Sequence, residues 1–317
     1  MEYERKKTLC REWRDIAGFL FKKRTCRQIA FSRNDGLLFS SGRRLFGAIY
    51  MRKINPKVIF TLTAGRTGSA WLADFLAQNY QATSIHEPLG IEDFGVRMPD
   101  IKVMRSFNNF GNNNTVQEFW ERKLSVIQQN SYIETNHTLG KCGLIENLYK
   151  TPIAADTKII ILKRDIVKQC SSYLVRNDFV HITTAWQWYL HPSYQKKLVN
   201  PAPFLKFDGV GLALWYCYEM AARQAFYKLA YSSSIKMIEV SLEDIVAPKG
   251  ANRLWQALGQ FGKCTLPPRK NENQIQAPKS LVQHLKKITS SIQFDADEVA
   301  LQALDDGFSF ENVSSAA

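Results

Sequence analysis

Short apolar runs alternate with amphipathic segments along most of the chain. Five runs are typical of strands: Val58–Leu62, Ala82–His86, Tyr132–Thr135, Lys158–Leu162 and Lys236–Val240. Six segments carry apolar residues at helical spacing: Ser69–Gln78, Val116–Gln128, Val167–Val175, Gly211–Ala230, Arg253–Phe261 and Ser280–Ile288. This alternation predicts an α/β fold, a three-layer sandwich around a central, mostly parallel sheet.

Two further segments stand out between these elements. The asparagine-rich stretch Asn108–Asn114 is typical of a loop. Residues 176–207 are rich in aromatic side chains and end in Pro201-Ala202-Pro203. We interpret 176–207 as an inserted lid or acceptor-binding region.

The positive charge is concentrated at the N-terminus. Of the formal net charge of +13, residues 1–53 contribute a surplus of nine, with 14 Lys and Arg against 5 Asp and Glu. Apolar residues at helical spacing there predict a basic helical extension that either packs on the main domain or contacts an anionic membrane or acidic polymer. The catalytic domain is expected to span residues 54–317, and nucleic-acid binding by it is not expected.

Cellular location is indicated by what the sequence does not contain. It has no apolar run of about eighteen residues, and its first residues lack the pattern of a secretory signal. The six cysteines are scattered, which argues against a disulfide framework and against a zinc site. We therefore expect a cytoplasmic protein, with peripheral membrane contact through the basic N-terminus left open.

A glycine turn, Gly65-Arg66-Thr67-Gly68-Ser69, follows the first predicted strand and opens a predicted helix. Backbone N–H groups and the positive end of a helix dipole converge at such a junction and form a cradle for an anion. The turn lacks the Gly-Lys-Ser/Thr ending of a nucleoside-triphosphatase loop and the spacing of a dinucleotide fingerprint.

A second anion site is predicted at the end of the strand Lys158–Leu162, whose continuous apolar run is typical of a strand buried on both faces. Arg164 follows that strand, and Ser172 lies eight residues later on the next helix. Ligands of open α/β sheets bind at the carboxyl ends of the strands, where an Arg fork and a Ser hydroxyl can hold a phosphate. The alternative is that Asp165 caps the helix and Arg164 is solvated.

Together, these segments resemble the donor site of sulfotransferases that use 3′-phosphoadenosine-5′-phosphosulfate (PAPS), in the carbohydrate-type and bacterial branch. The resemblance spans residues 55–275 and implies a P-loop-NTPase-like sulfotransferase fold. It implies contacts to PAPS from Gly65, Arg66, Thr67, Gly68, Ser69, Ala70, Trp71, Arg164, Ser172, Arg269 and Lys270. Ile166 stands where the family usually has proline, and the segment at Arg269 lacks the family's usual glycines.

The resemblance also implies the reaction, in which a sulfuryl group passes in line from PAPS to an acceptor hydroxyl of a carbohydrate or glycolipid. Arg66 would stabilise the charge on the leaving phosphate. The carboxylate of Glu87, in His86-Glu87-Pro88, would act as the base, and His137 is its rival. Glu87 could instead cap a turn before Pro88. No metal is expected, because no acidic cluster lies beside the loop in the sequence.

Two other functions stay open. An ATP-dependent phosphotransferase would need a Gly-Lys-Ser/Thr turn and a carboxylate for Mg²⁺, and Gly140-Lys141-Cys142 has the wrong third residue. A non-enzymatic protein could use the basic extension to bind polyanions.

Overall fold

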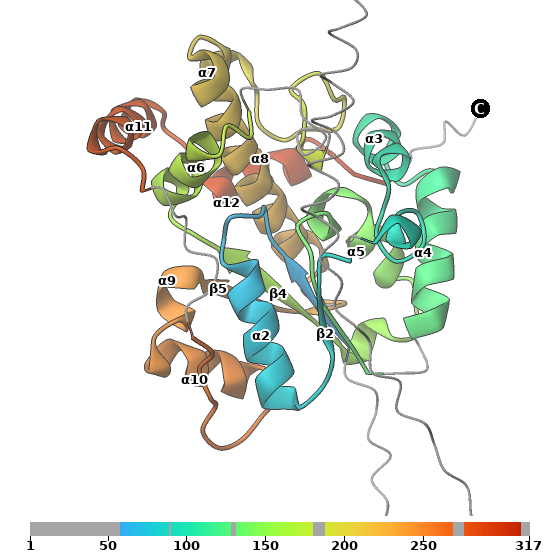
Figure 1. Ribbon diagram of the computed structural model, residues 1–317. Helices are drawn as coiled ribbons and strands as arrows, with labels where there is room; N and C mark the ends of the chain where they lie inside the picture. The colour runs from blue at the N-terminus through green and yellow to red at the C-terminus, as the bar shows by residue number, and fades with distance from the viewer. Residues whose placement is uncertain (1–57, 89, 128–130, 180–187, 269–275, 312–317) are drawn as a thin grey trace, which may run out of the picture. The chain divides into compact units, whose positions relative to one another are not determined.

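The computed structural model describes residues 58–88, 90–127, 131–179, 188–268 and 276–311 (Figure 1). The chain separates into two units, Met1–Arg52 and Lys53–Ala317, and the first lies wholly outside the described residues. The predictions for the basic extension therefore concern residues outside the described part of the chain. Arg269 and Lys270 also lie outside the described residues.

Five parallel strands form one sheet in the order β2-β3-β1-β4-β5. Their bounds are β1 Val58–Leu62, β2 Ser84–His86, β3 Tyr132–Thr135, β4 Thr157–Lys163 and β5 Lys236–Ser241. Strand β1 lies in the middle, and all five of its residues are buried. The predicted α/β class and its parallel central sheet are confirmed.

Helices cover both faces of the sheet (Figure 1). On one face, Ile59 and Ile160 pack against α2 (Ser69–Tyr80), α9 (Leu242–Ile245) and α10 (Pro248–Ala257). On the other face, Phe60 and Ile159 belong to a core with α3 (Ile101–Phe110), α4 (Asn114–Ile127), α5 (Leu144–Leu148), α8 (Asp208–Tyr231) and α12 (Ala296–Asp305). Because successive strand residues point to opposite faces, one apolar run supplies both cores.

A third apolar cluster contains Ala64, just beyond the end of β1. It joins α6 (Ile166–Val175), α7 (Ala202–Leu205), α8 and α11 (Lys279–Ser291) to the described part of the predicted lid. Phe179 and Tyr189 from that region stack at 4.9 Å and pack against Tyr173 and Tyr216. Aromatic side chains of residues 176–207 therefore lie beside the glycine turn.

Several predicted bounds differ from the structure, and two of the differences have a clear physical reason. Helix α3 continues to Phe110, so the expected loop at 108–114 is helical over its first three residues. Asn108 is tolerated there because its buried amide donates to Met104 O and Lys141 O. Helix α10 begins at Pro248 rather than Arg253, with proline in the first turn, where its missing N–H costs nothing.

A buried ion pair on α8 holds the backbone of residues 196–199 in place. Arg223 Nε donates to Glu219 Oε1 at 2.7 Å, and its other nitrogens donate to Asn108 Oδ1 and Lys196 O. Glu219 Oε2 accepts the backbone N–H groups of Leu198 and Val199 at 2.9 and 2.8 Å. Both charges are thus fully hydrogen-bonded inside the protein.

We expect Arg223→Met to lower the free energy of unfolding by about 3–5 kcal/mol, because it leaves the Glu219 carboxylate buried and without its cation. Urea denaturation measures the loss. Lys228→Met is the matched control on the same helix: Lys228 pairs with Glu239 at 3.1 Å but is 45% exposed, so the loss stays below about 1 kcal/mol. Equal losses in the two variants would contradict the assignment.

Candidate functional site

The turn between β1 and α2 has the backbone of an anion cradle. Gly65, Arg66 and Gly68 all lie in the left-handed region, with φ of 87°, 54° and 83°. Gly68 caps α2 and has no side chain to accept from the first amides of the helix. These N–H groups therefore have no capping side chain, which is the arrangement that binds anions at helix starts.

The backbone carbonyls of Ala64 and Gly65, at the start of the turn, accept hydrogen bonds from side chains of two helices. The Tyr173 hydroxyl lies 2.6 Å from Ala64 O and 2.9 Å from Gly65 O, and Gln169 also donates to Gly65 O. Tyr216 donates to Ala64 O at 2.8 Å. Helices α6 and α8 thus supply the donors for this side of the turn.

The two anion sites predicted from sequence adjoin each other. Arg66 Nε donates to Ser172 Oγ at 3.0 Å, and Arg164 Nη1 donates to Arg66 O at 2.7 Å. Burial, followed by the nearby Arg176, lowers the pKa of Arg66. A concentration of positive charge at one point favours an anion there.

Arg164 carries a buried donor that has no acceptor. Its Nε is inaccessible to solvent and has no hydrogen-bond partner among the described residues. Asp165 does cap α6, accepting from Lys168 N at 2.8 Å, as the alternative interpretation expected. Arg164, however, is not simply solvated, because its Nε is buried, and a buried donor is normally hydrogen-bonded.

Glu87 and His137, which the sequence analysis set against each other as candidate bases, form one pair. His137 Nδ1 lies 2.9 Å from Glu87 Oε1, because β2 and β3 are neighbours and each residue follows its strand. Glu87 adopts a left-handed φ of 47°, an uncommon conformation for a residue other than glycine. Strain of this kind concentrates at functional sites.

The charges around this pair fix its protonation. Burial raises the pKa of Glu87, but His137, His86 and Lys141 outweigh it and hold that pKa below its usual value. Burial and then Lys141 lower the pKa of His137, against the pull of Glu87. An ionised carboxylate only accepts, so Nδ1 of a neutral His137 must donate, which leaves Nε2 as a proton acceptor.

Of the remaining predicted residues, Thr67 and Ser69 form side-chain hydrogen bonds at the turn, whereas Ala70 and Trp71 belong to the first turn of α2. Ser69 Oγ lies 3.0 Å from His86 Nε2, which links the loop to the Glu87 side, and Thr67 bonds Thr63 within the turn. Ala70 and Trp71 form the first turn of α2. The Trp71 side chain is buried in the core, where it stacks on Phe75 and donates to Pro267 O, so only its backbone is available to a ligand.

Sequence reasoning missed several residues that shape the site: Gln169, Tyr173, Lys141 and Tyr216. Gln169 and Tyr173 lie four positions apart, which places both on the face of α6 toward the turn. That spacing beside the Arg164 motif was a usable signal. No comparable pattern pointed to Lys141 or Tyr216.

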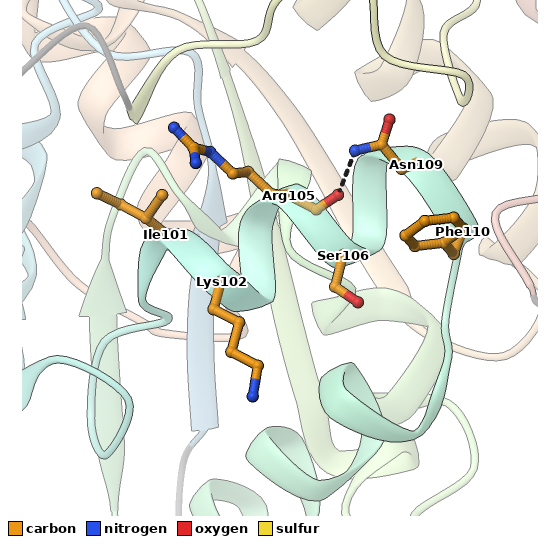
Figure 2. Close-up of a pocket in the computed structure, with 6 residues that line it drawn as sticks. All are labelled: Ile101, Lys102, Arg105, Ser106, Asn109 and Phe110. Carbon is orange, nitrogen blue, oxygen red and sulfur yellow. Dashed lines mark hydrogen bonds between the residues drawn. The ribbon is translucent and has the colours of Figure 1, made fainter.

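One surface hollow lies apart from the residues predicted to form the site. A surface hollow of about 460 Å³ lies along α3 and is lined by Ile101, Lys102, Arg105, Ser106, Asn109 and Phe110 (Figure 2). None of the predicted site residues lines it.

Within the described part of the chain, no group of three or more His, Cys, Asp or Glu is arranged to hold a metal ion, and no helix is long and apolar enough to cross a bilayer.

Two sulfotransferases are among the solved structures that this chain resembles. One is a sulfotransferase from Alicyclobacillus acidocaldarius, with 16% identity, a TM-score of 0.41, and coverage of 78% of this chain and 94% of that one. The other is a sulfotransferase domain from the curacin biosynthetic pathway, with 14% identity, a TM-score of 0.37, and coverage of 80% and 98%. No family model and no curated protein matches the sequence. Similarity at this level does not assign an activity.

We expect Gly68→Ala to weaken the binding of adenosine 3′,5′-bisphosphate by about 5- to 150-fold, because backbone strain alone costs about 1–3 kcal/mol. An added Cβ would also lie 2.3 Å from Leu242 Cδ1. Gly262→Ala is the matched control, since Gly262 has the same φ of 83° but nothing within 4 Å. Calorimetry should show unchanged binding in the control, and equal weakening in both variants would contradict a specific role for the turn.

Proposed function

We propose that this protein is a sulfotransferase that moves a sulfuryl group from PAPS to a hydroxyl of a carbohydrate or glycolipid. The single observation that carries the proposal is the buried Nε of Arg164, a donor without an acceptor beside an anion cradle. Arg164 and the turn are both at the carboxyl ends of adjacent parallel strands. A donor with phosphates at two positions suits two adjoining anion sites.

Two groups of residues would bind the two phosphate positions of PAPS. The amides of the turn and the guanidinium of Arg66 would hold the 5′-phosphosulfate, where charge grows on the leaving phosphate. Arg164 and Ser172 would hold the 3′-phosphate, with charge-assisted hydrogen bonds from the Arg fork. The contact between Arg66 and Ser172 supports this division, because it makes the two sites neighbours.

In the reaction, the acceptor oxygen attacks sulfur, and the bond between sulfur and the phosphate oxygen breaks. The products are a sulfate ester and adenosine 3′,5′-bisphosphate, with the acceptor's proton passing to His137 Nε2. The protein contributes mainly positioning and charge stabilisation, as in phosphoryl transfer. Glu87 orients the imidazole and stabilises it once protonated, as a carboxylate does in a catalytic triad.

Aromatic surfaces near the base support a carbohydrate or glycolipid acceptor. The rings of His137 and Tyr189 are 6.4 Å apart, and the neighbouring Trp188 stacks on Phe94 at 5.4 Å. Phe94 is 36% exposed. Flat aromatic faces that are partly exposed suit the apolar face of a sugar ring.

We expect the protein to bind adenosine 3′,5′-bisphosphate in the presence of EDTA and to bind ATP more weakly. Arg164→Ala should raise the dissociation constant for the bisphosphate by about 10- to 100-fold, because it removes a charged hydrogen-bond donor. Arg122→Ala, on α4, is the matched control and should leave binding unchanged. Tighter binding of ATP, or no effect of Arg164→Ala, would reject the donor assignment.

We expect His137→Ala to lower kcat by about 10²- to 10⁴-fold and Glu87→Gln to lower it less, both without loss of bisphosphate binding. Since the neutral imidazole is the active form and its pKa is lowered, activity persists below pH 6.5 and is lost as pH falls through the shifted pKa of His137. His284→Ala, at an exposed position on α11, is the control. A full-activity His137→Ala enzyme would show that the base is another group.

A further inference from the structure

His86 lies between the glycine turn and the proposed base. It is the last residue of β2, and its Nε2 lies 3.0 Å from the hydroxyl oxygen of Ser69, the first residue of α2. The same nitrogen lies 4.0 Å from Glu87 Oε1. That carboxylate oxygen is also the atom 2.9 Å from His137 Nδ1. A continuous line of polar atoms therefore joins the turn to His137.

The turn and the base also approach each other directly. A Cβ placed on Gly65 would lie 3.5 Å from His137 Cβ, so His137 packs against the turn. Ser69 is almost fully buried, whereas the His86 side chain is 31% exposed. His86 can therefore exchange a proton with solvent while its ring contacts a buried hydroxyl of the turn.

The Ser69 hydroxyl has a single hydrogen, and two groups compete for it. In the free protein it can donate to His86 Nε2, with the ring proton on Nδ1. An ionised phosphate only accepts, so a donor phosphate bound by Ser69 takes that hydrogen. Ser69 Oγ then presents only lone pairs to His86, and Nε2 must carry a proton for the hydrogen bond to persist.

The charges that face His86 decide whether this extra proton makes the ring a cation. Ser69 faces it from α2, Glu87 follows it in the chain, and His137 acts on it from the end of β3. Arg66 of the turn donates instead to a residue of α6. With a donor bound, the imidazole lies between a phosphate and the Glu87 carboxylate, and two nearby anions favour its charged form.

We propose that His86 is a positioning residue that takes up a proton from solvent when the donor binds. Its Nε2–H then holds Ser69 Oγ, whose own hydrogen is directed at the donor phosphate. This inference rests on the proposed function, in which the turn holds the 5′-phosphosulfate. The charge has a second effect, because a cation at His86 adds to burial and Lys141 in lowering the pKa of His137. His137 Nε2 therefore stays free to accept the proton of the attacking hydroxyl.

The first test is a nuclear magnetic resonance titration of the histidine rings in the full chain, with and without adenosine 3′,5′-bisphosphate. The His86 signal is assigned through His86→Gln, which keeps a neutral N–H toward Ser69. The bisphosphate should move the midpoint of the His86 titration to higher pH by about one unit, because it adds an anion beside the ring.

Calorimetry in buffers of different ionisation enthalpy measures the proton directly. At a pH between the free and bound midpoints, the wild type should take up about half a proton more than His86→Gln on binding the bisphosphate, as a one-unit shift requires. The difference between the two proteins removes the protons exchanged by the bisphosphate itself. His284→Ala, at an exposed position on α11, is the matched control and should keep the wild-type uptake.

A double-mutant cycle tests whether His86 acts through Ser69. His86→Ala should weaken bisphosphate binding about tenfold, which corresponds to the one-unit shift. The combined His86→Ala and Ser69→Ala variant should bind within about twofold of Ser69→Ala alone, because the imidazole has then lost the group it positions. A merely structural role for His86 would make the two losses additive.

The outcomes separate this inference from the proposed function. A His86 titration that stays in place in a wild-type protein that binds the bisphosphate overturns the inference, as do additive losses in the cycle. Where His86→Gln does not fold, His86→Asn replaces it with the same expectations. A wild-type protein that does not bind the bisphosphate at all rejects the transferase proposal, and the role of His86 is rejected with it.

Discussion

The geometry of the site depends on one requirement: the carbonyl oxygens behind the glycine turn need donors. A tight turn with its backbone in the left-handed region turns N–H groups and carbonyls to different sides, and buried carbonyls left unpaired would be costly. Tyr173, Tyr216 and Arg164 meet this requirement from α6, α8 and the end of β4. The same contacts that stabilise the turn therefore bring Arg164 and Ser172 next to it.

Much of the fold was predictable because the sheet is buried on both faces. Strands β1 and β3 have the predicted bounds, and the continuous apolar run of β4 lies inside the sheet between β1 and β5, as its composition indicated. Helix α3 was not predictable over Asn108, since asparagine and a nearby glycine are typical of loops. One acceptor of its amide, Met104 O, is on the same helix, but the other, Lys141 O, belongs to η2 (Leu139–Lys141), and local propensity contains no information about that contact.

The site was predictable where it depends on motifs and not where it depends on distant contacts. Both segments predicted to bind anions are short and continuous in sequence, and the prediction follows from Arg66, Arg164 and Ser172. Glu87 and His137 lie 50 positions apart and meet only because β2 and β3 are adjacent, which the sequence does not specify. They were interpreted as rivals, whereas the structure makes them partners. Whether each residue has the chemical role assigned by resemblance stays a prediction.

Helix α8 anchors the two halves of the site. Tyr216 donates to Ala64 O beside the glycine turn, and Gln224 donates to a carbonyl at the end of β1 and to one near the end of β4. Glu219 and Arg223 hold the backbone at residues 196–199. Under the proposed function, a single helix therefore holds both the donor side of the site and the segment that follows the aromatic residues of the acceptor side. A shift of α8 along its axis would therefore move both sides of the site together and change the distance between a bound donor and its acceptor.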